Sequence, residues 1–205
     1  MIPVVKGWST ETGIEVASLG VQVHGGMGFI EETGAAQYLR DVRITTIYEG
    51  TTGIQSNDLI GRKLGRDRGA AMSALISDME KELQALGALG DESAEATRRA
   101  ALEAVALLGN ATRSLLQALA SRPEAALGVS VPYLKLCGYV IGGWLLSRSA
   151  ALAAHGMRGG EREFYAAKIR TAAFYGAHLL PAAHALARVV EGGGGSVAAT
   201  DAALI

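Results

Sequence analysis

Glu49 is the residue with the clearest case for chemistry in this chain of 205 residues. It lies in a Tyr-Glu-Gly-Thr turn at positions 48–51, between two stretches of helical periodicity. A glycine-rich stretch at positions 25–28 precedes the turn, and a basic stretch at positions 61–64 follows it. A single carboxylate held on such a turn can remove a proton from a weak carbon acid. We therefore take Glu49 as the first candidate for a general base.

The elements that must position Glu49 are helices, because apolar residues recur at helical spacing along almost the whole chain. Only four prolines interrupt this pattern, which predicts an all-α fold. We expect a first helix to begin near Ser9 or Thr10, either of which is a good N-cap, and to end at Gly25-Gly26. Its predicted buried face consists of Ile14, Ala17, Leu19 and Val21.

The Glu49 turn is predicted to lie at a junction between two helices. A second helix covers about residues 31–42, and the β-branched stretch 44–47 disfavours its continuation. A third helix begins at Thr51 or Thr52. The segment from Gly65 to Gly69 then indicates a domain boundary.

Four longer helical patterns follow this boundary, at about residues 70–89, 94–120, 131–157 and 161–190. Their short connections predict an antiparallel bundle. Pro181 lies inside the last pattern and predicts a kink there. We divide the chain into a first domain at residues 1–66, a helical extension at residues 67–192 and a flexible tail at residues 193–205.

Composition excludes several classes of protein. The chain is 49% hydrophobic and 19% charged with a net charge of −1, which is typical of a globular protein and not of a disordered tail. It has no long basic block, so we expect no nucleic-acid partner. The longest apolar stretch, residues 140–146, is broken by Gly142 and Gly143, so we expect no membrane span.

The metal-binding and redox residue types are sparse. Cys137 is the only cysteine, which leaves neither a disulfide framework nor a cysteine metal site and favours a cytoplasmic location. No signal peptide is indicated at the N-terminus. The histidines show no metal-ligand spacing, so we expect no metal site; they are His24, His155, His178 and His184.

Three motifs in a fixed order closely resemble the C-terminal helical domain of flavin-dependent acyl-CoA dehydrogenases. They are Gln22 to Gly28, Arg40 to Ile44, and Ile47 to Thr51 followed by Ile54-Gln55. Residues from 70 onward resemble the extra C-terminal domain of a larger subgroup, which includes members acting on 3-methylmercaptopropionyl-CoA. The resemblance implies an acyl-CoA dehydrogenase C-terminal-like helical bundle followed by a second antiparallel bundle.

The resemblance gives Glu49 a specific role. In that family the motif's acid removes the proton on the carbon α to an acyl-CoA thioester, while the β-carbon passes a hydride to the flavin. Hydrogen bonds from the base's own backbone N–H and from a flavin hydroxyl stabilise the enolate-like oxygen. Exclusion of water by the acyl chain makes a carboxylate a stronger base. By the same carry-over, Gly50 lines the substrate.

The resemblance also implies FAD as the cofactor. Two groups of candidate contacts follow from it. The first reaches the FAD held by a neighbouring subunit, which implies a homo-oligomer; it is Gln22, Val23, His24, Gly25 and Gly26. The second lines the flavin nucleotide; it is Thr51, Thr52 and Gly53. The implied electron acceptor is an electron-transfer flavoprotein or a similar protein.

In the family, an N-terminal helical domain, a β-domain and the first helices of the C-terminal domain precede the region matched here. We therefore expect a C-terminal fragment of a larger enzyme, inactive alone and with FAD absent or weakly bound. The alternative is a non-catalytic helical oligomerisation or interaction module. A further choice concerns Arg40, Asp41 and Arg43, which either form a solvated ion-pair row or orient the Glu49 turn. We favour orientation.

Overall fold

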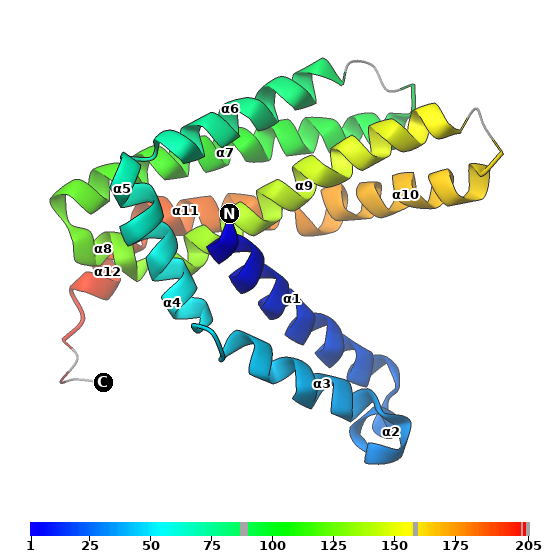
Figure 1. The fold of residues 1–205 in the computed structure, drawn as a ribbon, viewed down its shortest axis with the longest axis horizontal. Helices are drawn as coiled ribbons and strands as arrows, with labels where there is room; N and C mark the ends of the chain where they lie inside the picture. Colours follow the sequence, from blue (N-terminus) through cyan, green and yellow to red (C-terminus); the bar gives the residue numbers. More distant parts are fainter. Residues whose placement is uncertain (87–89, 158–159, 202, 204–205) are drawn as a thin grey trace.

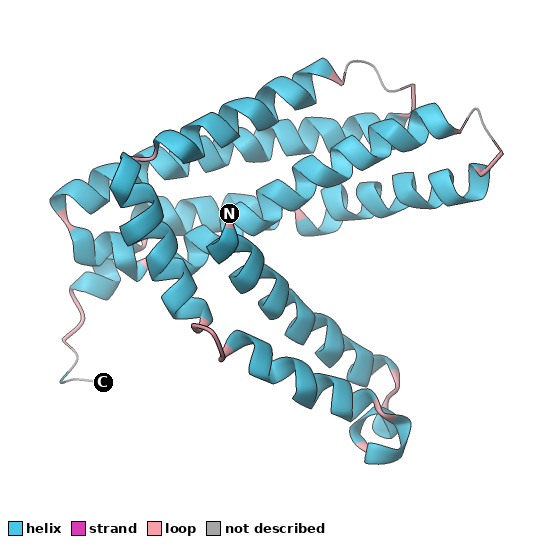
Figure 2. Ribbon diagram, in the orientation of Figure 1, coloured by secondary structure: helices cyan, strands magenta, loops and turns pink. Residues whose placement is uncertain are grey.

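The computed structural model describes residues 1–86, 90–157, 160–201 and 203. Within these residues the chain consists of helices and loops, with no strand (Figure 2). Helices from α6 (Ala70–Ala85) onward form a bundle, and a helical hairpin that contains α1 (Ile2–Val23) and α3 (Ala35–Arg43) projects from it (Figure 1). The prediction of an all-α fold with a second helical bundle is confirmed.

Five helices make up the bundle: α6 (Ala70–Ala85), α7 (Glu92–Ser121), α9 (Ser130–Gly156), α10 (Arg162–Phe174) and α11 (Ala182–Gly192). The central helices α7 and α9 pack on each other, and α11 packs on both. Their shared core is fully buried and includes Leu108, Leu115, Tyr133, Leu136 and Val140. The predicted end of the first long helix, Leu89, lies outside the described residues.

The predicted interruption at Pro181 is confirmed. A π-helix, η4 (Tyr175–Leu179), ends in an i to i−5 bond from the Leu180 N–H to the Tyr175 carbonyl, and α11 begins only after the proline. Proline cannot donate a backbone hydrogen bond, so the α-helical pattern cannot continue through it. The expected single helix over 161–190 is therefore two α-helices joined by a π-turn.

Two short helices were not predicted. α8 (Pro123–Gly128) fills the connection between α7 and α9, with proline in its first turn, where its missing N–H costs nothing. α12 (Gly194–Ala198) packs against α8. α12 lies at the start of residues 193–205, which were expected to form a flexible tail. The flexibility of this segment stays a prediction.

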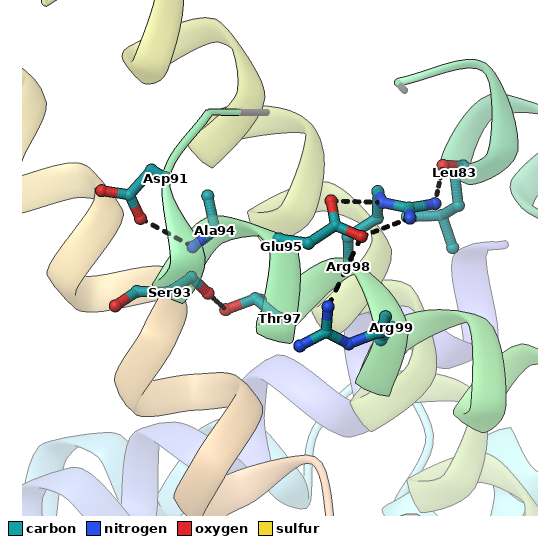
Figure 3. Close-up of polar contacts among 8 residues, drawn as sticks. All are labelled: Leu83, Asp91, Ser93, Ala94, Glu95, Thr97, Arg98 and Arg99. Carbon is teal, nitrogen blue, oxygen red and sulfur yellow. Dashed lines mark hydrogen bonds and ion pairs between the residues drawn. The ribbon is translucent and has the colours of Figure 1, made fainter. Parts of the chain in front are cut away.

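The start of α7 is fixed by polar contacts, which Figure 3 shows. Asp91 accepts a hydrogen bond at 2.9 Å from the Ala94 N–H and caps the helix. Arg98 bonds Glu95 on its own helix and donates at 3.1 Å to the carbonyl of Leu83 on α6. The guanidinium holds the pKa of the Glu95 carboxyl below its usual range. These contacts tie α6 to α7 across their connection.

α9 is long and apolar enough, by length and composition alone, to cross a membrane. However, 50% of its most apolar window is buried inside the bundle. A core helix of a helical domain passes the same test, because much of its surface packs against neighbouring helices. The apolar character of α9 is accounted for by its central place in the bundle.

The hairpin consists of α1 (Ile2–Val23), α2 (Gly26–Phe29), the 3-10 turn η1 (Glu31–Thr33), α3 (Ala35–Arg43), the 3-10 turn η2 (Ile44–Thr46) and α4 (Thr52–Asn57). A π-helix, η3 (Asp58–Leu64), and α5 (Gly65–Asp67) lead back to the bundle. α1 and α3 run side by side away from the bundle, with α2 at the far tip (Figure 1).

Three expectations for the hairpin were wrong in detail. α1 begins at Ile2 and not near Ser9, because Pro3 suits a first helical turn and buries against the bundle together with Val4. The helix expected over 31–42 is split at Gly34, which adopts the left-handed conformation with φ 76°.

The predicted buried face of α1 was also wrong. None of its four residues is buried, and the Leu19 side chain is 58% exposed. In the described part of the chain, α3 covers only one side of the outer half of α1. Several large apolar side chains of α1 are therefore exposed, including Val16, Leu19 and Val23.

The base of the hairpin is fixed to the bundle by close packing of α1 on α9. The Trp8 ring lies so near Gly138 that a Cβ at that glycine would be 2.3 Å from the ring, and it meets Tyr139 edge-on at 4.4 Å. Ser130 on α9 bonds Ser56 and Asn57 at 3.1 and 2.9 Å. The segment that carries Glu49 therefore rests on a rigid support.

Candidate active site

The Glu49 turn connects η2 to α4 at the base of the hairpin. Glu49 has φ 52° and Gly50 has φ 91°, so two successive residues adopt positive φ. This conformation is unfavourable for a residue with a Cβ and is natural for glycine. The predicted helix break after the β-branched stretch is confirmed, as is the helix start, where Thr51 caps α4 by accepting from the Ile54 N–H at 3.3 Å.

Side chains from two helices, α1 and α4, hold the turn. Lys6 on α1 donates to the Gly50 carbonyl at 2.6 Å, and Gln55 on α4 donates to the Glu49 carbonyl at 3.1 Å. Thr52 donates to the Glu11 carboxylate on α1 at 2.6 Å. Strained backbone persists only where its surroundings over-determine it, and these contacts do so here.

The functional groups of Glu49 itself remain available. Its side chain is exposed. Within the described residues, its backbone N–H donates to no carbonyl or side chain, since the turn's bonds to η2 come from Ile47 and Tyr48. The turn thus presents a carboxylate and an adjacent N–H donor on the same residue.

The two arginines of the second motif, Arg40 and Arg43, make contacts in different places. Arg40 forms a bidentate pair with Glu31 at 2.6 Å near the hairpin tip, so its expected role at the Glu49 turn is wrong. Arg43 donates at 2.7 Å to Thr46, the last residue of η2, and supports the segment that enters the turn. The reason is helical spacing, which directs Arg40 toward η1 and Arg43 toward η2.

The predicted flavin contacts fall into two separate places. Gly50 and residues 51–53 lie with Glu49 at the base of the hairpin, whereas Gln22 to Gly26 lie at its tip and are exposed. Lys6, which contacts the turn, and Gly25 are 19 residues apart. At 1.5 Å per helical residue, the distance along the helix between them is about 28 Å. One small ligand group cannot touch both places.

Glu49 lines neither of the two grooves that flank α1. A groove of about 440 Å³ runs between α1 and α3 and includes Val16, Gly20, His24 and Tyr38. A second, of about 340 Å³, lies between α1 and α9, where burial first and then the charge of Glu15 raise the pKa of Tyr139. Neither groove covers the Glu49 carboxylate, and its shielding from water by a bound acyl chain stays a prediction.

Sequence reasoning missed Lys6 and Glu11, which stabilise the turn from 44 and 41 residues away. No local signal marks them, because their partners are defined only when α1 packs beside α4. Gln55 belonged to a recognised motif but had no assigned role. In the described part of the chain, the metal-ligating residue types form no cluster that could hold a metal ion.

Two family profiles match the chain. The one described as acyl-CoA dehydrogenase, C-terminal domain, matches residues 1–65, which contain the Glu49 turn. The one described as acetyl-CoA dehydrogenase C-terminal like matches residues 71–201, more than half of the chain. The chain belongs to the acyl-CoA dehydrogenase family. Enzymes of this family generally depend on FAD and act on acyl-CoA substrates.

Similar acyl-CoA dehydrogenases extend well beyond this chain. It is 46% identical over 184 residues to 3-methylmercaptopropionyl-CoA dehydrogenase of Ruegeria pomeroyi, which covers 88% of the chain and 31% of the relative. It is 34% identical over 200 residues to the broad-specificity linear acyl-CoA dehydrogenase FadE5 of Mycobacterium tuberculosis. This match covers 93% of the chain and 33% of the relative. The chain thus spans about a third of the length of these relatives.

A shorter match involves an electron-transfer complex. The chain is 39% identical over 59 residues to the caffeyl-CoA reductase-Etf complex subunit CarC of Acetobacterium woodii, covering 29% of the chain and 16% of the relative.

Proposed function

We propose that this chain supplies the catalytic base and part of the flavin site of an enzyme that dehydrogenates an acyl-CoA thioester between its α and β carbons. Glu49 removes the α-proton, and Gly50 lines the substrate. The observation that carries this proposal is the pairing of an exposed carboxylate with an unengaged N–H on one residue, held in a strained and braced turn.

The chemistry follows from that pairing. An α-proton of a thioester becomes acidic when donors stabilise the negative charge that develops on the carbonyl oxygen. The N–H of Glu49 is one such donor, next to the carboxylate that takes the proton. Bound FAD supplies the hydride acceptor. Exclusion of water by the bound acyl chain makes the Glu49 carboxylate a stronger base.

The two separated sets of flavin contacts support an oligomer. Thr51, Thr52 and Gly53 line the flavin beside their own Glu49, and residues 22–26 contact the FAD of a neighbouring subunit. The distance between the hairpin's base and tip suits contacts with two different flavins. We further propose a cytoplasmic enzyme that passes electrons to an electron-transfer flavoprotein, for which the likeness to the Etf-complex subunit is support.

A chimera tests the proposal. Residues 1–205 replace the matching region of the Ruegeria enzyme, and flavin bleaching is followed after addition of an acyl-CoA. Glu49→Gln should lower the rate of flavin reduction by about 10²–10⁴, the usual contribution of a general base. Flavin content and thermal unfolding show that both chimeras assemble. A Glu49→Gln chimera as fast as its parent would overturn the proposal.

The exposed apolar surface favours a second candidate, a non-catalytic interaction module. Most of the large exposed hydrophobic side chains lie in the first 54 residues, with Val23 84% and Phe29 81% exposed. Monomeric soluble proteins rarely expose large apolar patches. Purified alone, the chain should be a colourless, inactive oligomer. Stoichiometric bound flavin would favour a retained cofactor site, and thioester-dependent flavin reduction by the chain alone would exclude the module.

A further inference from the structure

Two side chains donate hydrogen bonds to successive carbonyls of the Glu49 turn. The sequence motifs described above assign neither side chain a role. Lys6 reaches from α1 to the Gly50 carbonyl at 2.6 Å, and Gln55 reaches back from α4 to the Glu49 carbonyl at 3.1 Å. We propose that Lys6 and Gln55 are positioning residues for the base, and we name the pair the carbonyl clamp. This inference rests on the proposed function of Glu49.

The clamp fixes the direction of the catalytic side chain. Each peptide plane is rigid, so a bond to its carbonyl sets its orientation. Binding the carbonyls of residues 49 and 50 holds the two peptide planes that follow the Glu49 Cα. The bonds from Ile47 and Tyr48 to the Ile44 carbonyl hold the chain that enters the turn, so the backbone is restrained on both sides of the Cα that carries the carboxylate. Without these donors, a residue with a Cβ prefers negative φ, which would turn the carboxylate away.

The clamp also keeps the Glu49 N–H available. Both donors bind carbonyls, so within the described residues the Glu49 N–H stays available for the thioester oxygen. A change of Glu49 to negative φ would reorient that N–H together with the carboxylate. Base and oxyanion donor therefore depend on the same two contacts.

Lys6 is well placed for this role. Lys6 is half-buried and lies between Val4 and Gly7, which are buried against the bundle, so its backbone is rigid. Its ammonium lies 5.9 Å from the centre of the Tyr48 ring, on the residue before the base. A charged donor forms a stronger bond to a carbonyl than a neutral one does. Lys6 thus links the support on α9, through α1, to the turn.

The first test uses the 205-residue chain and a readout of backbone geometry. Nuclear magnetic resonance shifts and couplings of Glu49 and Gly50 report their φ angles. The Lys6→Met, Gln55→Leu double variant should lose the positive-φ signature at Glu49, whereas Lys81→Met, an exposed lysine on α6, should keep it. Unchanged φ angles at both positions in the double variant would overturn the inference.

The second test uses the flavin-loaded chimera. Lys6→Met should lower the rate of flavin reduction per bound flavin by about 10–100-fold, since a misplacement of about 1 Å costs about 10²-fold. KM should stay within about twofold, the α-deuterium isotope effect should rise, and Lys6→Arg should restore most of the rate. A purely structural role would lower flavin content and leave the rate per flavin unchanged.

The two proposals fail in different ways. If Glu49→Gln retains full activity, the assigned base is wrong. If Glu49→Gln loses activity while Lys6→Met and Gln55→Leu keep the parental rate per flavin and the parental φ angles, the base stands and the clamp is refuted.

Discussion

Replacing Glu49 with glycine should make the chain more stable while removing its chemistry. Glu49 has φ 52° and an exposed side chain, so its Cβ causes strain and its carboxylate forms no stabilising contact within the described residues. The left-handed conformation costs a residue with a Cβ about 1–2 kcal/mol. Glycine removes that cost but gives the unfolded chain extra freedom worth about 0.5–1 kcal/mol.

The net gain is about 0.5–1 kcal/mol. For a chain of this length, 1 kcal/mol shifts the melting temperature by about 2–4 °C, so Glu49→Gly should melt about 1–4 °C higher than the parent. Thermal unfolding of the 205-residue chain, followed by circular dichroism, measures this shift. Glu49→Gln keeps the Cβ and should melt within about 1 °C of the parent.

Arg68 provides a matched control, because it is exposed and has φ 54° but lies at the connection between α5 and α6. Arg68→Gly should raise the melting temperature by a similar amount without affecting the site. Gly50→Ala should act in the opposite direction, since alanine is strained at φ 91°. The reasoning fails if Arg68→Gly has a higher melting temperature than the parent while Glu49→Gly melts at or below the temperature of Glu49→Gln. In that case the backbone is not strained at Glu49.

Three further predictions concern the bundle. Burial raises the pKa of the Cys137 thiol from its ordinary 9.0 to about 12. The unfolded chain therefore releases the thiol proton at lower pH than the folded chain, and the free energy of unfolding should fall as pH rises from 9 to 12. Urea titrations of Cys137→Ala should show a weaker fall between pH 9 and 10. Asp91→Ala removes the cap of α7 and should lower the free energy of unfolding by about 1 kcal/mol, whereas unchanged stability would mean that the cap is redundant. Leu108→Ala empties a fully buried position and should cost about 2–5 kcal/mol in chemical denaturation, and a loss below 1 kcal/mol would contradict the assigned core.

The sequence was informative where a signal is local. Helical periodicity gave the all-α class and the long helices of the bundle, Pro181 gave the break in the last one, and Thr51 gave the start of α4. These features depend on neighbouring residues along the chain and on backbone chemistry. The motif around Glu49 was recognised for the same reason, since its residues are contiguous.

Burial was the property that the sequence alone misjudged. Ile14, Ala17 and Val21 have the spacing of one helix face, yet none of them is buried. Periodicity identifies an apolar face but does not supply its partner.

What the sequence determined by itself was the identity of the candidate base and the helical class of its surroundings. Tertiary structure alone decided the geometry: the packing of α1 beside α4 brings Lys6 to Gly50, and the length of α1 separates Gly25 from Glu49. The physical reason is that helical propensity and turn chemistry act over a few residues. A contact across 44 residues exists only once two helices have been fixed on a common support.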